Sequence, residues 1–179
     1  MSNQQDQEGY TPNTLDDEDS GENEGLDVEE GLEANIDWRV AKSLERLRHQ
    51  VNAMAPSRNK ASDGGIGDPA HAKRTSDHNP WVDFDGRKGV VTARDITHDP
   101  AGGCDADRIA EQIRASRDPR VKYIIWNRRI ASSAAKDGKA PWEWRPYTGK
   151  NGHTHHIHIS VQPERAKYDD ESDWQVRLP

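Results

Sequence analysis

A run of histidines between residues 153 and 158 is the strongest chemical signal in this sequence of 179 residues. The alternation His156-Ile157-His158-Ile159-Ser160 is typical of a β-strand, in which successive side chains point to opposite faces. The isoleucines then face the core, and His156, His158 and Ser160 share the other face. Two imidazoles at this spacing can bind one metal ion or transfer protons, because neutral imidazole binds zinc and titrates near neutral pH. A strand face that is merely rich in histidine is the competing interpretation.

Two other segments could complete a metal site. Residues 74–80 are polar and contain His78, and residues 93–98 contain Asp95 within a β-branched stretch. A catalytic zinc ion takes three protein ligands and leaves a fourth position open. Histidine and carboxylate side chains from separate strands and loops can supply that set.

These segments, in this order, resemble a known family. Ser57-Arg58, Arg74-x-Ser76-x-His78, Ala93-x-Asp95 and His156-x-His158 are similar to motifs of the zinc D-alanyl-D-alanine carboxypeptidase/dipeptidase family of peptidoglycan peptidases. That family includes phage endolysins, and its fold is shared with the hedgehog signalling domain. The resemblance spans residues 40–162.

The resemblance implies an activity and a set of site residues. It implies a Zn²⁺ ion held by His78, Asp95 and His158. It also implies that Arg58 and Ser76 contact the substrate, a peptidoglycan stem peptide in which one peptide bond is hydrolysed. We therefore expect a DD-carboxypeptidase or endopeptidase that lyses bacterial cell walls.

The sequence departs from the family in two places. Asp95 follows His78 by seventeen residues, more than the family's usual gap, and residues 79–89 look like an inserted hairpin or flap. The family usually has an acidic general base three residues before its last histidine, where this chain has His155. A histidine can perform the same proton transfer, but strict strand alternation points His155 away from His158. His156 and Glu143 are the rival candidates for the base.

The elements that would position these residues alternate irregularly between helix and strand. An apolar stripe predicts a helix over residues 40–54, and a second helix is predicted over 105–117, capped by Asp105 or Asp107. Strands are predicted over 90–97, over 121–126 with a possible continuation through 128–130, and over 155–161. Residues 57–88 should be a long functional loop. The pattern favours an α+β fold: a small antiparallel sheet with flanking helices, similar to hedgehog and the DD-peptidases.

The charge distribution separates an acidic arm from a basic body. Residues 1–38 hold thirteen of the chain's 32 acidic residues and no Lys or Arg, which leaves 19 acids against all 25 bases in the remainder. We expect residues 1–34 to be a disordered arm and residues 35–179 to form the peptidase-like domain. The arm is either a solubilising tail or a segment that docks on a protein partner or on the basic body.

The sequence also bears on localisation. No apolar run approaches the roughly 20 residues that a membrane helix needs. The first residues have neither the basic nor the apolar region of an export signal. We therefore expect synthesis in the cytoplasm and action at the bacterial cell wall after release by phage lysis, from a virion or by injection.

Two alternatives come from other functional classes. The basic body and the triplet Asp77-His78-Asn79 loosely suggest a metal-dependent nuclease, although neither HNH spacing nor a basic helix stripe is present. We therefore expect no nucleic-acid partner. The histidine at the family's base position suggests instead a binding or virion-structural protein that keeps the fold without the catalysis.

Overall fold

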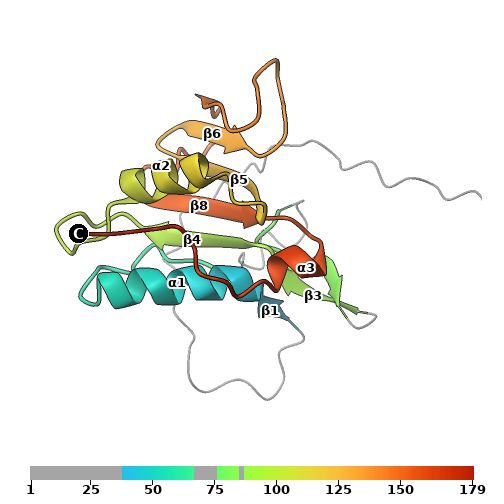
Figure 1. The fold of residues 1–179 in the computed structure, drawn as a ribbon, viewed down its shortest axis with the longest axis horizontal. Helices are drawn as coiled ribbons and strands as arrows, with labels where there is room; N and C mark the ends of the chain where they lie inside the picture. The colour runs from blue at the N-terminus through green and yellow to red at the C-terminus, as the bar shows by residue number, and fades with distance from the viewer. Residues whose placement is uncertain (1–37, 67–75, 85–86) are drawn as a thin grey trace, which may run out of the picture.

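The computed structural model describes residues 38–66, 76–84 and 87–179, which form two sheets with helices packed on one side (Figure 1). The larger sheet has five antiparallel strands in the order β4-β8-β5-β6-β7. Its strands are β4 (Ala93–Thr97), β8 (His156–Val161), β5 (Val121–Trp126), β6 (Arg129–Ser132) and β7 (Arg145–Pro146).

The smaller sheet has the order β1-β3-β2, from β1 (Arg39–Val40), β3 (Arg87–Val91) and β2 (Val82–Phe84). β1 runs parallel to β3, and β2 pairs with β3 antiparallel. The β2–β3 pairing confirms the hairpin predicted for residues 79–89.

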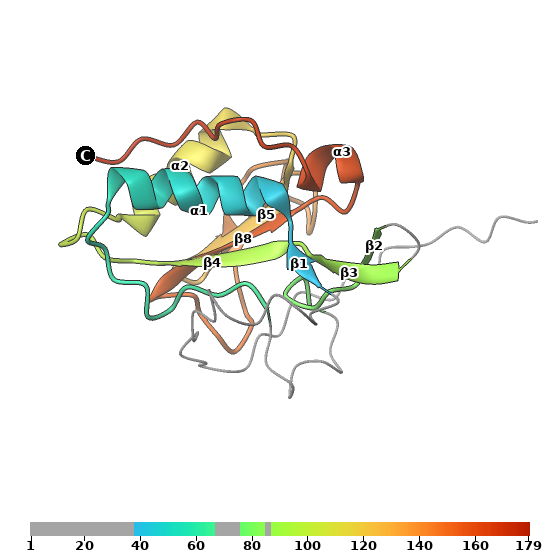
Figure 2. The same ribbon diagram turned by 90° about the horizontal axis from the view of Figure 1, so that it is seen from below.

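Helices α1 (Lys42–Met54) and α2 (Ala106–Ser116) cover one face of the larger sheet, and the short α3 (Arg165–Tyr168) follows β8 (Figure 2). The apolar stripe predicted α1 correctly, except that Val40 lies in β1. Asp105 caps α2, because its side chain accepts a hydrogen bond from the backbone N–H of Asp107. Within the described residues, no helix is both long and apolar enough to cross a membrane.

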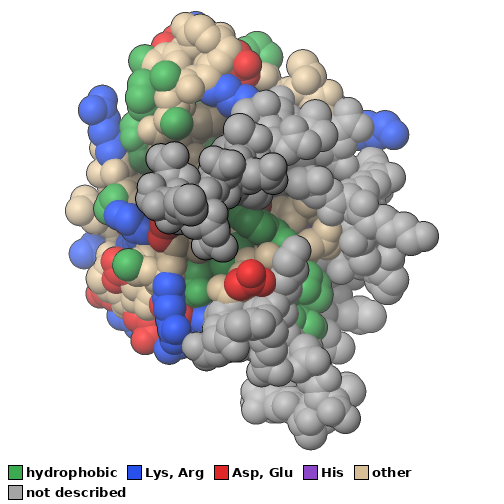
Figure 3. Space-filling model, turned by 90° about the vertical axis from the view of Figure 1, so that its right-hand side faces the viewer, with side chains coloured by type: hydrophobic (Ala, Val, Ile, Leu, Met, Phe, Trp, Pro, Cys, Tyr) green, Lys and Arg blue, Asp and Glu red, His purple; other side chains and the backbone are tan. Residues whose placement is uncertain are grey.

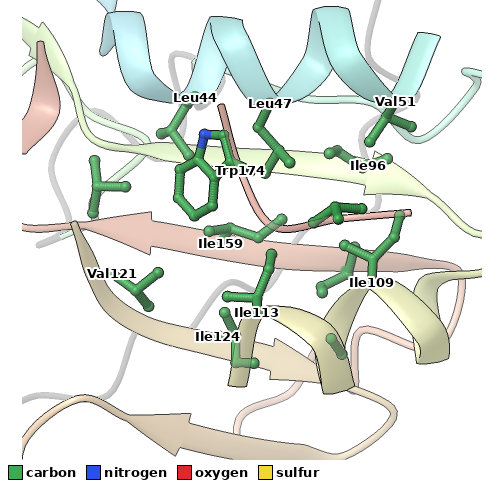
Figure 4. Packing of buried hydrophobic residues seen from close by; sticks show 14 of the residues in the cluster. Leu44, Leu47, Val51, Ile96, Ile109, Ile113, Val121, Ile124, Ile159 and Trp174 are labelled. Carbon is green, nitrogen blue, oxygen red and sulfur yellow. The ribbon is translucent and has the colours of Figure 1, made fainter. Parts of the chain in front are cut away.

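The main core lies between these helices and the sheet (Figure 4). The inward face of β8 contributes Ile157, Ile159 and Val161, all fully buried. Figure 4 shows how the helices and neighbouring strands meet this face through Leu44, Leu47, Val51, Ile96, Ile109, Ile113, Val121 and Ile124. Alternation therefore assigns the isoleucines of the histidine run to the core, as predicted.

The C-terminal segment closes this core from outside the two helices (Figure 2). Trp174 is 1% exposed, and its indole N–H donates to the Ser43 carbonyl at 2.7 Å. The Arg120 guanidinium lies 4.1 Å from the centre of the same ring system. The segment is hydrogen-bonded to Gln50 of α1 and Gln112 of α2 and buries Trp174 and Val176, so it is part of the domain's core.

The structure corrects two predicted strands. The stretch 90–97 is divided at Thr92 between β3 of the small sheet and β4 of the large one. The continuation of β5 through 128–130 is wrong, because Asn127 and Arg128 have positive φ angles of 47° and 61° and turn the chain into β6. Two residues in the left-handed region are typical of a tight hairpin turn.

The observed architecture confirms the coarse prediction of a small antiparallel sheet with flanking helices. The predicted acidic arm, residues 1–34, lies outside the described residues, as does Arg74 of the family-like motif.

Candidate metal centre

The face of the large sheet opposite the helices carries the histidines. β4 and β8 pair so that Asp95 lies directly opposite His158 and Thr97 opposite His156. On the other side of β8, Ile125 of β5 is the partner of His158. The ring of Tyr123 stacks on the imidazole of His158, and the centres of the two rings are 5.6 Å apart. Strand register alone therefore places a carboxylate beside an imidazole in a buried position.

His78 reaches this pair from the turn before β2. The turn is closed by a hydrogen bond from Asn79 N–H to the Ser76 carbonyl at 3.0 Å, and His78 N–H donates to the Ser76 hydroxyl at 3.2 Å. Asp77 anchors the turn, since its carboxylate accepts hydrogen bonds from the Lys122 ammonium and the Trp81 indole. These contacts fix the direction in which His78 points.

The potential ligand atoms of His78, Asp95 and His158 lie close together, and the two histidines are nearest to different oxygens of the Asp95 carboxylate. His78 Nε2 is 3.0 Å from His158 Nδ1 and 3.4 Å from Asp95 Oδ2, and His158 Nδ1 is 3.1 Å from Asp95 Oδ1. With zinc–nitrogen bonds of about 2.0–2.1 Å and tetrahedral angles, neighbouring ligand atoms should be about 3.3 Å apart. The nitrogen–nitrogen distance and the nearest nitrogen–oxygen distances are close to this value, so these residues can hold a zinc-sized ion.

The remaining nitrogens of both histidines are also engaged. His78 Nδ1 lies 2.8 Å from the Gly65 carbonyl, and His158 Nε2 lies 2.9 Å from the Ser160 hydroxyl. A histidine that binds a metal commonly makes a hydrogen bond through its second ring nitrogen, and this bond fixes the orientation and the tautomer of the ring. The carbonyl on Nδ1 requires that nitrogen to carry the proton, which leaves the Nε2 lone pair of His78 for a metal.

Gly64 brings a loop against the outer edge of β4. Its carbonyl accepts a hydrogen bond from Asp95 N–H at 2.8 Å, and its own N–H donates to the Asp95 carbonyl at 3.3 Å. A Cβ atom at residue 64 would lie 3.2 Å from Asp95 Oδ2. The absence of a side chain at this position lets the loop pack beside the carboxylate.

The surroundings of Asp95 and His153 favour the ionised carboxylate and the neutral imidazole. Burial alone would raise the pKa of the Asp95 carboxyl, but the imidazoles of His78, His156 and His158 outweigh it and hold that pKa well below its usual range. Burial, helped by the nearby His158, lowers the pKa of His153 to about 3. Asp95 is therefore ionised and His153 neutral near neutral pH.

The chain was also compared with known proteins. No family model, no curated protein and no solved structure matches it.

His153 is a member of the cluster that sequence reasoning missed. It is fully buried, and its ring lies 5.0 Å from that of His156 and 5.3 Å from that of His158. Its backbone has a φ of 48°, stabilised by a hydrogen bond from His153 N–H to the Asn151 side chain at 3.0 Å. The dipeptide Asn151-Gly152 signalled this turn in the sequence.

His155 and His156, the two candidate bases in the run, have different surroundings. His156 Nε2 lies 3.7 Å from Asp95 Oδ2, and the His156 side chain is 14% exposed. His155 precedes β8, is exposed, and accepts a hydrogen bond from His98 N–H through its carbonyl. The structure therefore brings His156 to the cluster and leaves His155 at the surface.

The other candidates lie in separate environments. The Glu143 carboxylate pairs with Lys139 at 2.7 Å and accepts a hydrogen bond from Ala140 N–H, on the rim of a cavity of about 380 Å³ beside the end of α2. The Arg58 side chain is fully buried in a two-pronged ion pair with Asp63. The substrate contacts predicted for Arg58 and Ser76 stay predictions.

Proposed function

We propose that this chain is a zinc metallopeptidase that hydrolyses a peptide bond of the peptidoglycan stem peptide. The observation that supports it most is the cluster formed by His78 Nε2, His158 Nδ1 and the two carboxylate oxygens of Asp95, whose nearest separations of 3.0–3.4 Å are close to those of a tetrahedral site. The family resemblance of the motifs supplies the substrate class, a wall peptide at the bacterial surface.

The residues divide into those that hold the ion and one that moves protons. His78, Asp95 and His158 would bind zinc, which when bound polarises a carbonyl and activates water. His156 is the general base and acid: its Nε2 takes a proton from the attacking water and returns it to the leaving amine. Its position beside Asp95 Oδ2, 3.7 Å away, supports this role better than the exposed side chain of His155.

Purified cell walls provide the direct test. The wild-type chain should contain about one equivalent of tightly bound zinc, release muropeptides identified by mass spectrometry, and lose activity with a chelator. His158→Ala should lose both metal and activity, because a three-ligand zinc site does not survive removal of one ligand. His156→Ala should keep the tightly bound zinc and lower kcat by about 100-fold or more, the usual contribution of a general base.

His49→Ala is the matched control, since His49 is an exposed histidine of α1 on the opposite side of the sheet. It should keep both zinc and hydrolysis. A metal-free wild type that still cleaves walls would contradict the zinc site. Zinc binding without cleavage of any wall would favour the non-catalytic binding protein instead.

The nuclease alternative receives less support from the charges. On the described part of the face seen in Figure 3, Lys and Arg side chains are interspersed with Asp and Glu side chains. Nucleic-acid binding requires basic side chains gathered in a patch or stripe. We accordingly propose a peptide rather than a nucleic acid as the substrate.

A further inference from the structure

The Asp95 carboxylate lies near the imidazoles of His153 and His156 as well as near those of His78 and His158. Potential ligand atoms of Asp95, His153 and His156 lie within 4.8 Å of one another, as do those of His78, Asp95 and His158. We propose that Asp95, His153 and His156 form a second, weaker site for a divalent transition metal, which shares the Asp95 carboxylate with the first site.

His153 is held in an orientation suited to metal binding. Its Nδ1 lies 2.9 Å from the Asn151 carbonyl, so that nitrogen carries the proton and Nε2 keeps the lone pair. This is the same arrangement that the Gly65 carbonyl imposes on His78. Asn127 N–H donates to the His153 carbonyl at 2.9 Å and ties the residue to the β5–β6 turn.

His156 supplies the second nitrogen. Its Nε2 is buried and has no hydrogen-bond partner among the described residues, and Asp95 Oδ2 lies 3.7 Å from it. The rings of His153 and His156 meet edge to face with their centres 5.0 Å apart. Both imidazoles therefore lie beside the same carboxylate, and neutral imidazole is a common ligand for zinc, copper, nickel and iron.

The second site must be the weaker one for two reasons. Its separation of 3.7 Å between His156 Nε2 and Asp95 Oδ2 exceeds the 3.0–3.4 Å of the first site, so the residues have to shift to close around an ion. The two ions would also share one carboxylate and repel each other at short range. We expect a second dissociation constant at least tenfold larger than the first.

Occupation of this site would have a functional consequence that rests on the proposed function. A metal ion on His156 Nε2 removes the lone pair that accepts the proton. Excess Zn²⁺ should therefore inhibit wall hydrolysis over the concentration range in which the second ion binds. His153 would then set the sensitivity of the enzyme to metal.

The test of the site is a titration of the metal-free full chain with Zn²⁺, in which calorimetry and equilibrium dialysis measure the binding. The wild type should bind two equivalents in two steps. His153→Ala and His156→Gln should each lose only the weaker step, and Asp95→Asn should weaken both. His155→Ala removes an exposed histidine of the same run and should keep both steps, which controls for adventitious surface binding.

A single step in the wild type up to millimolar Zn²⁺ would overturn the proposal. So would a second step that persists in both His153→Ala and His156→Gln. Far-UV circular dichroism shows whether the buried His153 variant is folded, and His156→Gln decides the question if it is not. Two-step binding in a chain that cleaves no wall would refute the peptidase while leaving the second metal site intact.

Discussion

Replacement of Arg58 by methionine separates a structural from a substrate-binding role for this residue. The guanidinium donates to both carboxylate oxygens of Asp63, to the Asn52 side chain and to the Asn59 carbonyl. Asp63 in turn accepts hydrogen bonds from the backbone N–H and the hydroxyl of Thr97 in β4. The pair therefore connects the end of α1 and the following loop to the strand that carries Asp95.

The expected loss of stability in Arg58→Met follows from the burial of the ion pair. The side chains of Arg58 and Asp63 are 0% and 3% exposed, so Arg58→Met leaves a buried carboxylate without its cation. Removing one partner of a buried pair costs about 3–5 kcal/mol. With an m value of about 2 kcal/mol/M for urea, the unfolding midpoint should fall by about 2 M. Urea unfolding followed by Trp fluorescence measures this shift.

Arg46→Met is the matched control, because Arg46 pairs with Asp173 where the side chains are 42% and 66% exposed. An exposed pair contributes at most about 1 kcal/mol. The double variant Arg58→Met/Asp63→Leu should recover part of the loss, since no unpaired charge remains. Wild-type stability in Arg58→Met combined with loss of wall hydrolysis would refute the structural role and restore Arg58 to the substrate site.

Two further predictions concern the core. Trp174→Ala should lower the free energy of unfolding by about 3–5 kcal/mol in urea titrations, because a fully buried ring and its bond to the Ser43 carbonyl are lost; an unchanged midpoint would show that the C-terminal segment does not stabilise the core. Burial raises the pKa of Cys104 to about 11, so at pH 8 its reaction with a disulfide reagent should require global unfolding, and rapid labelling of the native chain would contradict this.

Local patterns predicted most of the elements because the causes of those elements are local. The apolar stripe of α1 and the Asp105 cap of α2 are contained within a few residues. The division of residues 90–97 at Thr92 is not local: Thr92 N–H donates to the Asp77 carbonyl, and the Thr92 carbonyl accepts from Val161 N–H. β-propensity in one segment cannot show that its two halves pair in different sheets.

The site shows the same division between local and tertiary causes. Strand alternation placed His156, His158 and Ser160 on one face, and the register confirms it. His153 was missed because its left-handed backbone takes it out of the strand pattern, and its position depends on contacts with the turn at Asn127. The burial of Arg58 could not be predicted from the sequence, because it depends on tertiary packing. Its partner Asp63 is nevertheless only five residues away in the sequence.

The choice of His156 as the proposed general base depends on where β8 begins. In the family that the motifs resemble, the base lies three residues before the last histidine, and the residue at that position here is His155. Side-chain direction in a strand changes with every residue, so an offset of one places neighbouring imidazoles on opposite faces. Because β8 starts at His156, that ring faces Asp95, and His155 is left with its carbonyl bonded to His98 and its side chain exposed. A base must reach the proton it removes, so geometry favours His156 over the residue at the motif position.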